Sequence, residues 1–195
     1  MKIDKWSPKI IGCCENPNHK TIEKKLTKLC LNIRKNTKSG GQDWVSNKTF
    51  NTLATHNIHT DERFHDLNMW IFDRVQEYSN HMKYKNDYEC ATSWMSIYKK
   101  HDYQEYHTHS IHSLSAVYFL KSDPKKSSRI IFKVSEDPFV NEPTPREYNY
   151  DNSNTAWYEA MPGRLLIFKS NLPHCVERSE QNDTRISLAY NFNII

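Results

Sequence analysis

The sequence predicts a mainly β protein of the α+β class, in which an antiparallel jelly-roll barrel carries N-terminal helices on one outer face. Helical periodicity is confined to the first 83 residues, and from Tyr88 onward the chain consists of short β-branched and aromatic runs separated by turns. Helices followed by strands favour separate layers over alternating βαβ units. The 195 residues suit one domain with a sizeable core.

Two amphipathic helices are expected in the N-terminal part. The first begins near Thr21, which we assign as its N-cap, and ends before the loop Lys-Ser-Gly-Gly-Gln. The second runs from about residue 60 to 83, with Asp61 in its first turn, where the helix dipole favours a negative charge. We therefore divide the chain into an N-terminal extension with one helix, residues 1–60, packed on or preceding the core, and a barrel domain with its supporting helix, residues 61–195.

The barrel strands are predicted from short apolar runs bounded by turn sequences such as Lys-Ser-Asp-Pro and Met-Pro-Gly. A polar, proline-containing insert, residues 135–154, separates the third strand from the fourth. Loops of this length are often functional, so the insert is either a lid over an active site or a surface excursion. The predicted strands are residues 91–98, 114–120, 129–134, 156–159, 165–168 and 186–192.

Composition restricts the environment and the partners. The formal net charge is only +4, with scattered lysines and no dense basic stripe, so a nucleic-acid partner is permitted but not favoured. Five cysteines without a CxxC pair indicate neither a disulfide framework nor a zinc knuckle. The sequence has no membrane-length apolar run and no signal-peptide core. We expect a cytoplasmic protein, in the host cytoplasm if the gene is viral, with no membrane partner.

Three histidines are the candidate metal ligands. His107 and His109 are one residue apart, so on a strand they point to the same face. His174 follows a turn and a buried strand that would deliver it to the mouth of the same barrel. Imidazole suits Fe, Zn, Cu and Ni, and three protein ligands leave open positions for catalysis. Glu105 shares the face of His107 and is an alternative third ligand, although we prefer His109.

A candidate carboxylate site lies on the last predicted strand. Arg185 and Ser187 are two residues apart and alternate with apolar residues, so both point to one face. The planar fork of a guanidinium binds a carboxylate through two parallel hydrogen bonds. The alternative is a surface arginine paired with Glu177 or Glu180.

Together these residues resemble the 2-oxoglutarate and Fe(II)-dependent dioxygenases, and within them an oxygenase subfamily with an H-x-H…H…R-x-S pattern. The likeness covers about residues 90–195, with its elements in the right order, and their combination is fairly specific. Ala116 stands where glycine is common in the pattern. The matching residues are Trp94 and Tyr98, His107 and His109, Leu114 and Ser115, Gly163, Leu165, Phe168, Ser170 and His174, and Arg185, Ser187 and Asn191.

This resemblance implies a double-stranded β-helix fold and an iron site. Fe(II) would be held by His107, His174 and His109, with His109 in place of the aspartate of the broader H-x-D pattern. Three neutral ligands would leave the iron more positive than two histidines and a carboxylate do. No catalytic side chain beyond the metal ligands is implied.

The resemblance also implies the co-substrates and the reaction. 2-Oxoglutarate would place its distal carboxylate against Arg185 and Ser187, with Tyr98 and Ser115 lining its pocket. With O2, such an enzyme hydroxylates a C–H bond of its substrate. The substrate, a peptide, a protein or a small molecule, is not identified by the sequence.

Two other classes of protein share parts of this pattern. A cupin-type metalloprotein that does not use 2-oxoglutarate would explain the histidines, but Ser113 and Leu114 occupy the places where its glutamate is expected, and Arg185 would be unexplained. A non-catalytic barrel serving as a binding or virion-associated module is the second alternative. An oxygenase acting on nucleobases ranks below one acting on a peptide or a small molecule.

Overall fold

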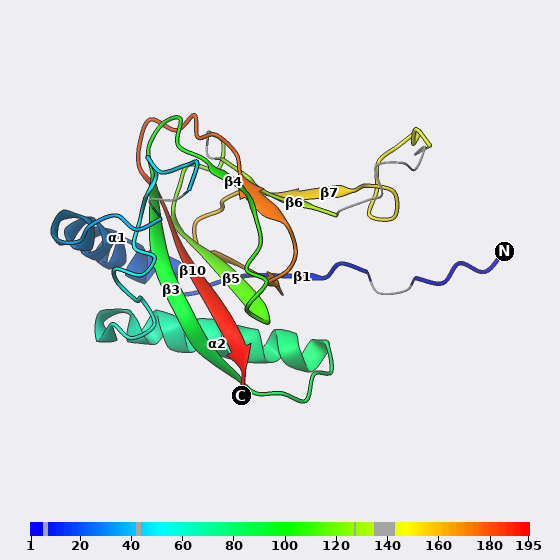
Figure 1. Ribbon diagram of the computed structural model, residues 1–195, viewed down its shortest axis with the longest axis horizontal. Helices are drawn as coiled ribbons and strands as arrows, with labels where there is room; N and C mark the ends of the chain where they lie inside the picture. The colour runs from blue at the N-terminus through cyan, green and yellow to red at the C-terminus, as the bar shows by residue number, and fades with distance from the viewer. Residues whose placement is uncertain (6–7, 42–43, 127, 135–142) are drawn as a thin grey trace.

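A computed structural model describes residues 1–5, 8–41, 44–126, 128–134 and 143–195. Two antiparallel sheets face one another, and two helices lie on the outer side of the larger sheet (Figure 1). The helices are α1, His19–Asn36, and α2, His65–His81, which follows the 3-10 turn η1, Glu62–Phe64.

The sheets have the strand order of a jelly roll. The larger sheet runs β1-β8-β5-β10-β3-β2 and the smaller β4-β9-β6-β7, with every neighbouring pair antiparallel. From β3 onward the chain crosses from one sheet to the other after almost every strand, and this winding closes the double-stranded β-helix. The strands are β1 Ile11–Glu15, β2 Phe50–Asn51, β3 Tyr88–Tyr98, β4 Gln104–His107, β5 Leu114–Lys121, β6 Ile130–Lys133, β7 Thr155–Tyr158, β8 Arg164–Lys169, β9 His174–Val176 and β10 Arg185–Ile194.

The larger sheet is buried on both faces, because side chains alternate along each strand. On β10, Ile186, Leu188 and Tyr190 join the apolar cluster beneath the helices. Arg185 and Ser187 point the other way, toward the smaller sheet, and line a cavity there. Burying each aliphatic side chain stabilises the fold by roughly 1.5–3 kcal/mol. The apolar outer face therefore fixes the strand register, and the register decides which side chains point to the inner face.

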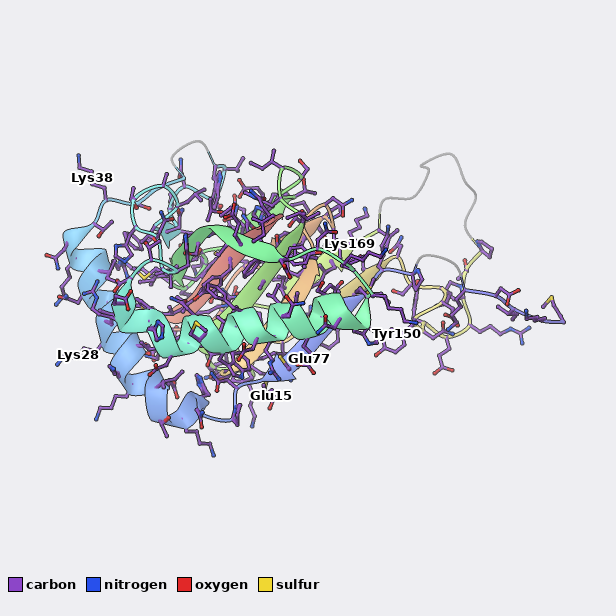
Figure 2. The ribbon with its side chains drawn as sticks, turned by 90° about the horizontal axis from the view of Figure 1, so that it is seen from below. Glu15, Lys28, Lys38, Glu77, Tyr150 and Lys169 are labelled. Atoms are coloured by element: carbon purple, nitrogen blue, oxygen red, sulfur yellow. The ribbon has the colours of Figure 1, made fainter. Side chains whose placement is uncertain are left out.

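Both helices bury one stripe against this outer face, and Figure 2 shows α2 running across the sheet with α1 beside it. Tyr190 on β10 also donates a hydrogen bond to Asn68 Oδ1 of α2 at 2.9 Å. No helix among the described residues is long and apolar enough to cross a membrane. The buried apolar helix residues are Leu26, Cys30 and Ile33 of α1 and Leu67, Ile71, Val75 and Tyr78 of α2.

The two predicted helices and six predicted strands are confirmed, but the N-cap and four short strands were not predicted correctly. Helix α1 begins at His19 with Asn18 in the N-cap position, and Thr21 lies in the first turn, where its hydroxyl donates to Asn18 O at 2.7 Å. Strands β1, β2, β4 and β9 are only two to five residues long and carry no clear periodicity. Each takes its hydrogen bonds from neighbouring strands: β1 pairs with β8, β2 pairs with β3, and β9 lies between β4 and β6. The boundary at residue 60 stays a prediction.

The predicted lid falls partly outside the described residues, which omit 135–142. Its remaining part, residues 143–154, is largely exposed, and Asp151 pairs there with Lys5 at 2.8 Å. None of the residues lining the cavity between the sheets comes from this described part.

We predict that Gly163→Ala destabilises the protein. Gly163 has a φ of +88°, and a Cβ there would lie 2.8 Å from Cβ of His19 on α1. The left-handed backbone alone costs a non-glycine residue about 1–3 kcal/mol, and the contact adds to this. Urea unfolding measures the loss. The exposed loop variant Asn182→Ala is the control, and equal stabilities of the two variants would contradict the prediction.

Candidate metal centre

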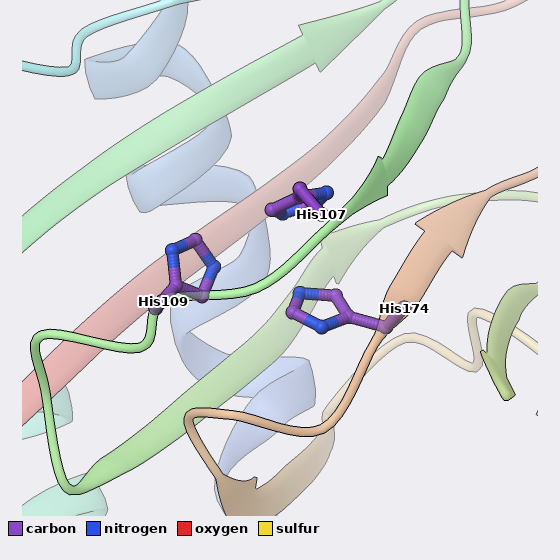
Figure 3. A group of neighbouring side chains, drawn as sticks. All are labelled: His107, His109 and His174. Atoms are coloured by element: carbon purple, nitrogen blue, oxygen red, sulfur yellow. The ribbon is translucent and has the colours of Figure 1, made fainter. Parts of the chain in front are cut away.

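Strands β4 and β9 of the smaller sheet, together with the loop that follows β4, bring three imidazoles together (Figure 3). His107 ends β4 and is paired in register with His174, the first residue of β9. His109 follows two residues beyond the end of β4, where its N–H donates to Ser170 O at 2.8 Å. One ligand nitrogen from each ring lies within 4.8 Å of the other two. A metal ion about 2.1 Å from each nitrogen, with all three ligands on one side, places the nitrogens roughly 3.0–3.4 Å apart, so the rings draw closer together when an ion binds.

Backbone carbonyls orient two of the three rings. Nδ1 of His107 donates to Glu105 O at 2.8 Å, and Nδ1 of His174 donates to Leu172 O at 2.9 Å. A carbonyl oxygen only accepts, so Nδ1 carries the proton in both rings and Nε2 keeps its lone pair. Such outer hydrogen bonds fix the tautomer and the ring orientation of metal-binding histidines.

Burial keeps these imidazoles neutral. Burial, together with the neighbouring His107, lowers the pKa of His174 to about 3. Burial, with His107 and His112 nearby, lowers the pKa of His109 to about 3. The pKa of His107 is also lowered by burial. Only a neutral imidazole can bind a metal, so all three rings are in the ligating form at neutral pH.

Glu105 does not join the histidines. Its carboxylate accepts hydrogen bonds from the N–H groups of Val45 at 2.9 Å and Ser46 at 3.2 Å. Burial acts to raise its pKa, but the hydrogen bonds it accepts hold the pKa below the usual value. The one group of potential metal ligands among the described residues contains His109 instead.

Arg185 lies fully buried on the inward face of β10, with 0% of its surface exposed. Its guanidinium stacks over the ring of Tyr98 at 4.4 Å and near that of Phe119 at 5.4 Å. Nη1 is 3.5 Å from Ser187 Oγ, whereas Nε and Nη2 have no hydrogen-bond partner among the described residues. A buried charge with unused donors is costly, so this group is arranged to receive an anion.

The surface pairing considered for Arg185 does not occur. Glu177 instead accepts two hydrogen bonds from Arg129, at 2.6 and 2.7 Å. Glu180 is a mainly exposed side chain beside His101.

One cavity joins the histidines to the arginine. It runs between the sheets from a half-exposed end at His107 and His109 to a closed end at Tyr98 and Arg185. Ser187 lines it, as predicted from its spacing to Arg185.

Ser115 lies apart from this cavity. Its hydroxyl donates to Asn191 Oδ1 at 2.8 Å and is 2.8 Å from the hydroxyl of Ser170. Ser170 is the residue whose carbonyl accepts from His109 N–H. Ser115 therefore braces the loop of a metal-site histidine, and we leave it out of the proposed 2-oxoglutarate pocket.

The cavity also contains residues that sequence reasoning did not select. Trp44 stacks on His107 with ring centroids 6.3 Å apart, and Gln104 lines the cavity beside it. Trp94, noted only as part of a pattern, places its edge against His109 at 5.5 Å. No local signal marks Trp44, because it lies in a loop more than sixty residues before the histidine it contacts.

Fold and site together define a jelly-roll protein in which three converging histidines and a buried arginine line one cavity. A family model described as "Putative 2OG-Fe(II) oxygenase" matches residues 92–191. The chain belongs to this family and is a 2-oxoglutarate and Fe(II)-dependent oxygenase, an enzyme that uses Fe(II), 2-oxoglutarate and O2. A comparison with curated proteins finds no match.

Solved structures support the fold. A Pseudomonas putida prolyl-4-hydroxylase matches with a TM-score of 0.64 and 15% identity over 95% of this chain and 92% of its own. A viral collagen prolyl hydroxylase from Paramecium Bursaria Chlorella virus-1 matches with a TM-score of 0.60 and 11% identity, over 93% of this chain and 94% of its own. An α-ketoglutarate-dependent carbocyclase from nogalamycin biosynthesis matches with a TM-score of 0.66 and 8% identity, over 94% of this chain and 79% of its own.

The residues present fit the groups that the family requires. Three neutral imidazoles on one side of the cavity are suitable donors for Fe(II). The unused donors of Arg185 are suitable for a carboxylate of 2-oxoglutarate.

We predict that Arg185→Met stabilises the ligand-free protein by about 1–3 kcal/mol, because it removes a buried charge that lacks a partner and keeps the apolar stem. Urea unfolding without ligands measures this. Adding Fe(II) and 2-oxoglutarate under nitrogen should stabilise the wild type more than the variant. Arg129→Met is the control, since it breaks the ion pair with Glu177 and should not stabilise. A destabilised Arg185→Met would contradict the prediction.

Proposed function

We propose that this oxygenase hydroxylates a C–H bond of a peptide, a protein or a small molecule, with Fe(II) held by His107, His109 and His174. The distal carboxylate of 2-oxoglutarate is bound by Arg185 and Ser187. The observation that carries this proposal is one cavity lined both by three converging neutral imidazoles and by a fully buried guanidinium with two unused nitrogens.

Each residue has a defined task in this reaction. Fe(II) held there would supply, together with 2-oxoglutarate and O2, the oxidising chemistry for the C–H bond: one oxygen atom of O2 would go to the substrate as hydroxyl and the other to the succinate formed with CO2. The histidines hold the metal from one side and leave its other positions open. Arg185 and Ser187 set the direction of the keto acid, while Tyr98 and Phe119 cover the guanidinium and exclude water from its ion pair.

Three imidazoles give this site an unusual charge. The common set of two histidines and one carboxylate contributes one negative charge, which His109 does not. Glu105 lies nearby in sequence, but its carboxylate is hydrogen-bonded to the amides of Val45 and Ser46. Iron in this site therefore keeps its full positive charge.

The substrate is constrained only as a class. The similar structures include prolyl hydroxylases, a carbocyclase and an epimerase, which supports keeping both peptide and small-molecule substrates. A nucleic-acid substrate stays disfavoured by the modest charge of +4. The cytoplasmic location stays a prediction.

The alternative classes explain less of the site. A cupin-type metalloprotein would not need a buried, unpaired Arg185 on the inward face. A non-catalytic barrel would have no need for three converging rings, two of which have their tautomers fixed by backbone carbonyls.

Anaerobic titration with Fe(II) and 2-oxoglutarate tests the proposal, read by the charge-transfer absorption of the iron–keto acid chelate. His174→Ala should abolish the absorption, since a buried ligand is lost. Arg185→Ala should weaken 2-oxoglutarate binding roughly 100-fold or more, because charge-assisted hydrogen bonds worth about 1.5–3 kcal/mol each disappear. Arg178→Ala, at an exposed arginine outside the cavity, is the control. An unchanged signal in both site variants would rule out the assignment.

The choice of third ligand has its own test. His109→Ala should lose most Fe(II) affinity, measured by equilibrium dialysis, whereas Glu105→Ala should still bind one Fe(II). His109→Asp should retain Fe(II), because it restores the two-histidine, one-carboxylate set. Iron loss in Glu105→Ala together with retention in His109→Ala would show that Glu105 is the ligand and leave the enzyme class intact.

A further inference from the structure

Trp44 stands at the entrance of the active-site cavity. It belongs to residues 44–49, a segment between α1 and β2 that is part of neither sheet and that we call the strap. Its indole stacks on the ring of His107 with an interplanar angle of 30° and a centroid distance of 6.3 Å. An aromatic side chain from a distant loop thus covers the ring of a proposed iron ligand.

The exposure of the lining residues shows from which end a substrate must arrive. Arg185 and Tyr98 are 0% and 3% exposed, so that end of the cavity is closed. Trp44, His107 and His109 are half-buried and form the open end. The indole thus lies at the end of the cavity where solvent reaches the histidines.

Glu105 holds the strap in place. One of its carboxylate oxygens accepts from Val45 N–H at 2.9 Å, and the other accepts from Ser46 N–H at 3.2 Å and from Gln104 Nε2 at 3.0 Å. Its backbone carbonyl accepts from Nδ1 of His107 at 2.8 Å. The same residue thus orients a proposed iron ligand and the segment that carries Trp44.

Two further contacts seat the strap. Thr49 Oγ1 donates to Tyr103 O at 3.0 Å, on the chain leading into β4. Trp44 N–H donates to Gly41 O at 3.1 Å. Gly41 has a φ of +62°, and a Cβ there would lie 2.7 Å from Asn51 Nδ2 and 3.1 Å from the indole. The positive φ and the contact with Asn51 favour glycine at position 41, and the indole packs against this glycine.

We propose that Trp44 is the wall of the active site against which the substrate packs, and that Glu105 is the positioning residue that holds this wall over His107. This inference rests on the proposed oxygenase function. The flat apolar face of an indole fits an aliphatic or saturated-ring carbon skeleton next to the reacting C–H bond. Val45 and Ile111, 75% and 86% exposed, add apolar surface next to Trp44 and two residues after His109.

The first test measures succinate formed from 2-oxoglutarate without any added substrate. Removing the wall in Trp44→Ala should raise this uncoupled turnover roughly threefold, because a closed site suppresses side reactions. The KM for 2-oxoglutarate should stay within about twofold of the wild type, since the Arg185 end is unchanged. Trp44→Phe should restore low turnover, because it keeps an aromatic wall.

Glu105→Gln should also raise the uncoupled turnover, as Trp44→Ala does, since the side-chain amide cannot accept hydrogen bonds from both strap N–H groups. Glu180→Gln and Trp157→Ala, at exposed positions outside the cavity, are the controls. Equal changes of turnover and of KM in Trp44→Ala, or no change in either, would overturn the inference.

The second test is spectroscopic and uses Co(II) as the probe. Binding of Co(II) to the metal-free protein should quench tryptophan emission, and Trp44→Phe should show a smaller quench, since the indole that stacks on His107 is gone. Glu105→Gln should bind the same amount of Co(II) with a smaller quench, and Trp157→Phe should keep the full quench. If the wild type binds Co(II) but Trp44→Phe leaves the quench unchanged, the inference alone fails. A wild type that binds no Co(II) refutes the proposed function as well.

Discussion

The site depends on the alternation of side chains along strands that are buried on both faces. On β10, Ile186, Leu188 and Tyr190 pack under the helices, and this packing forces Arg185 and Ser187 toward the smaller sheet. A slip of one residue would place the guanidinium in the apolar cluster and expel the leucine, at a cost of several kcal/mol. The helices thus contribute to the active site without touching it, because they fix the register.

Desolvation leaves the histidines of the site neutral but leaves its arginine charged. It keeps the imidazoles of His109 and His174 neutral, which prepares them for a metal. It also leaves Arg185 as a buried cation with unused donors, since an arginine stays protonated even when burial lowers its pKa. The protein alone therefore carries a local electrostatic cost, which 2-oxoglutarate would relieve if it binds as we propose.

The metal side is built from short elements that depend on their neighbours. His107 and His174 face each other across β4 and β9, strands of four and three residues. His109 lies beyond the strand, and its loop is held through Ser170 and Ser115. Glu105 then ties this side to the strap that carries Trp44, so the ring orientation of an iron ligand and the cavity entrance share one anchor.

The sequence by itself determined the layers, both helices and the strands β3, β5, β6, β7, β8 and β10, because periodicity and turn residues are local properties of the chain. It also identified the three histidines and the pair Arg185 and Ser187, whose spacing of two on a strand gives a shared face. Only the tertiary structure decided that Glu105 holds the strap, that Ser115 contacts Ser170 outside the cavity, and that Trp44 stacks on His107. These depend on contacts between segments about sixty residues apart, and alternation along a strand cannot report which distant segment lies opposite.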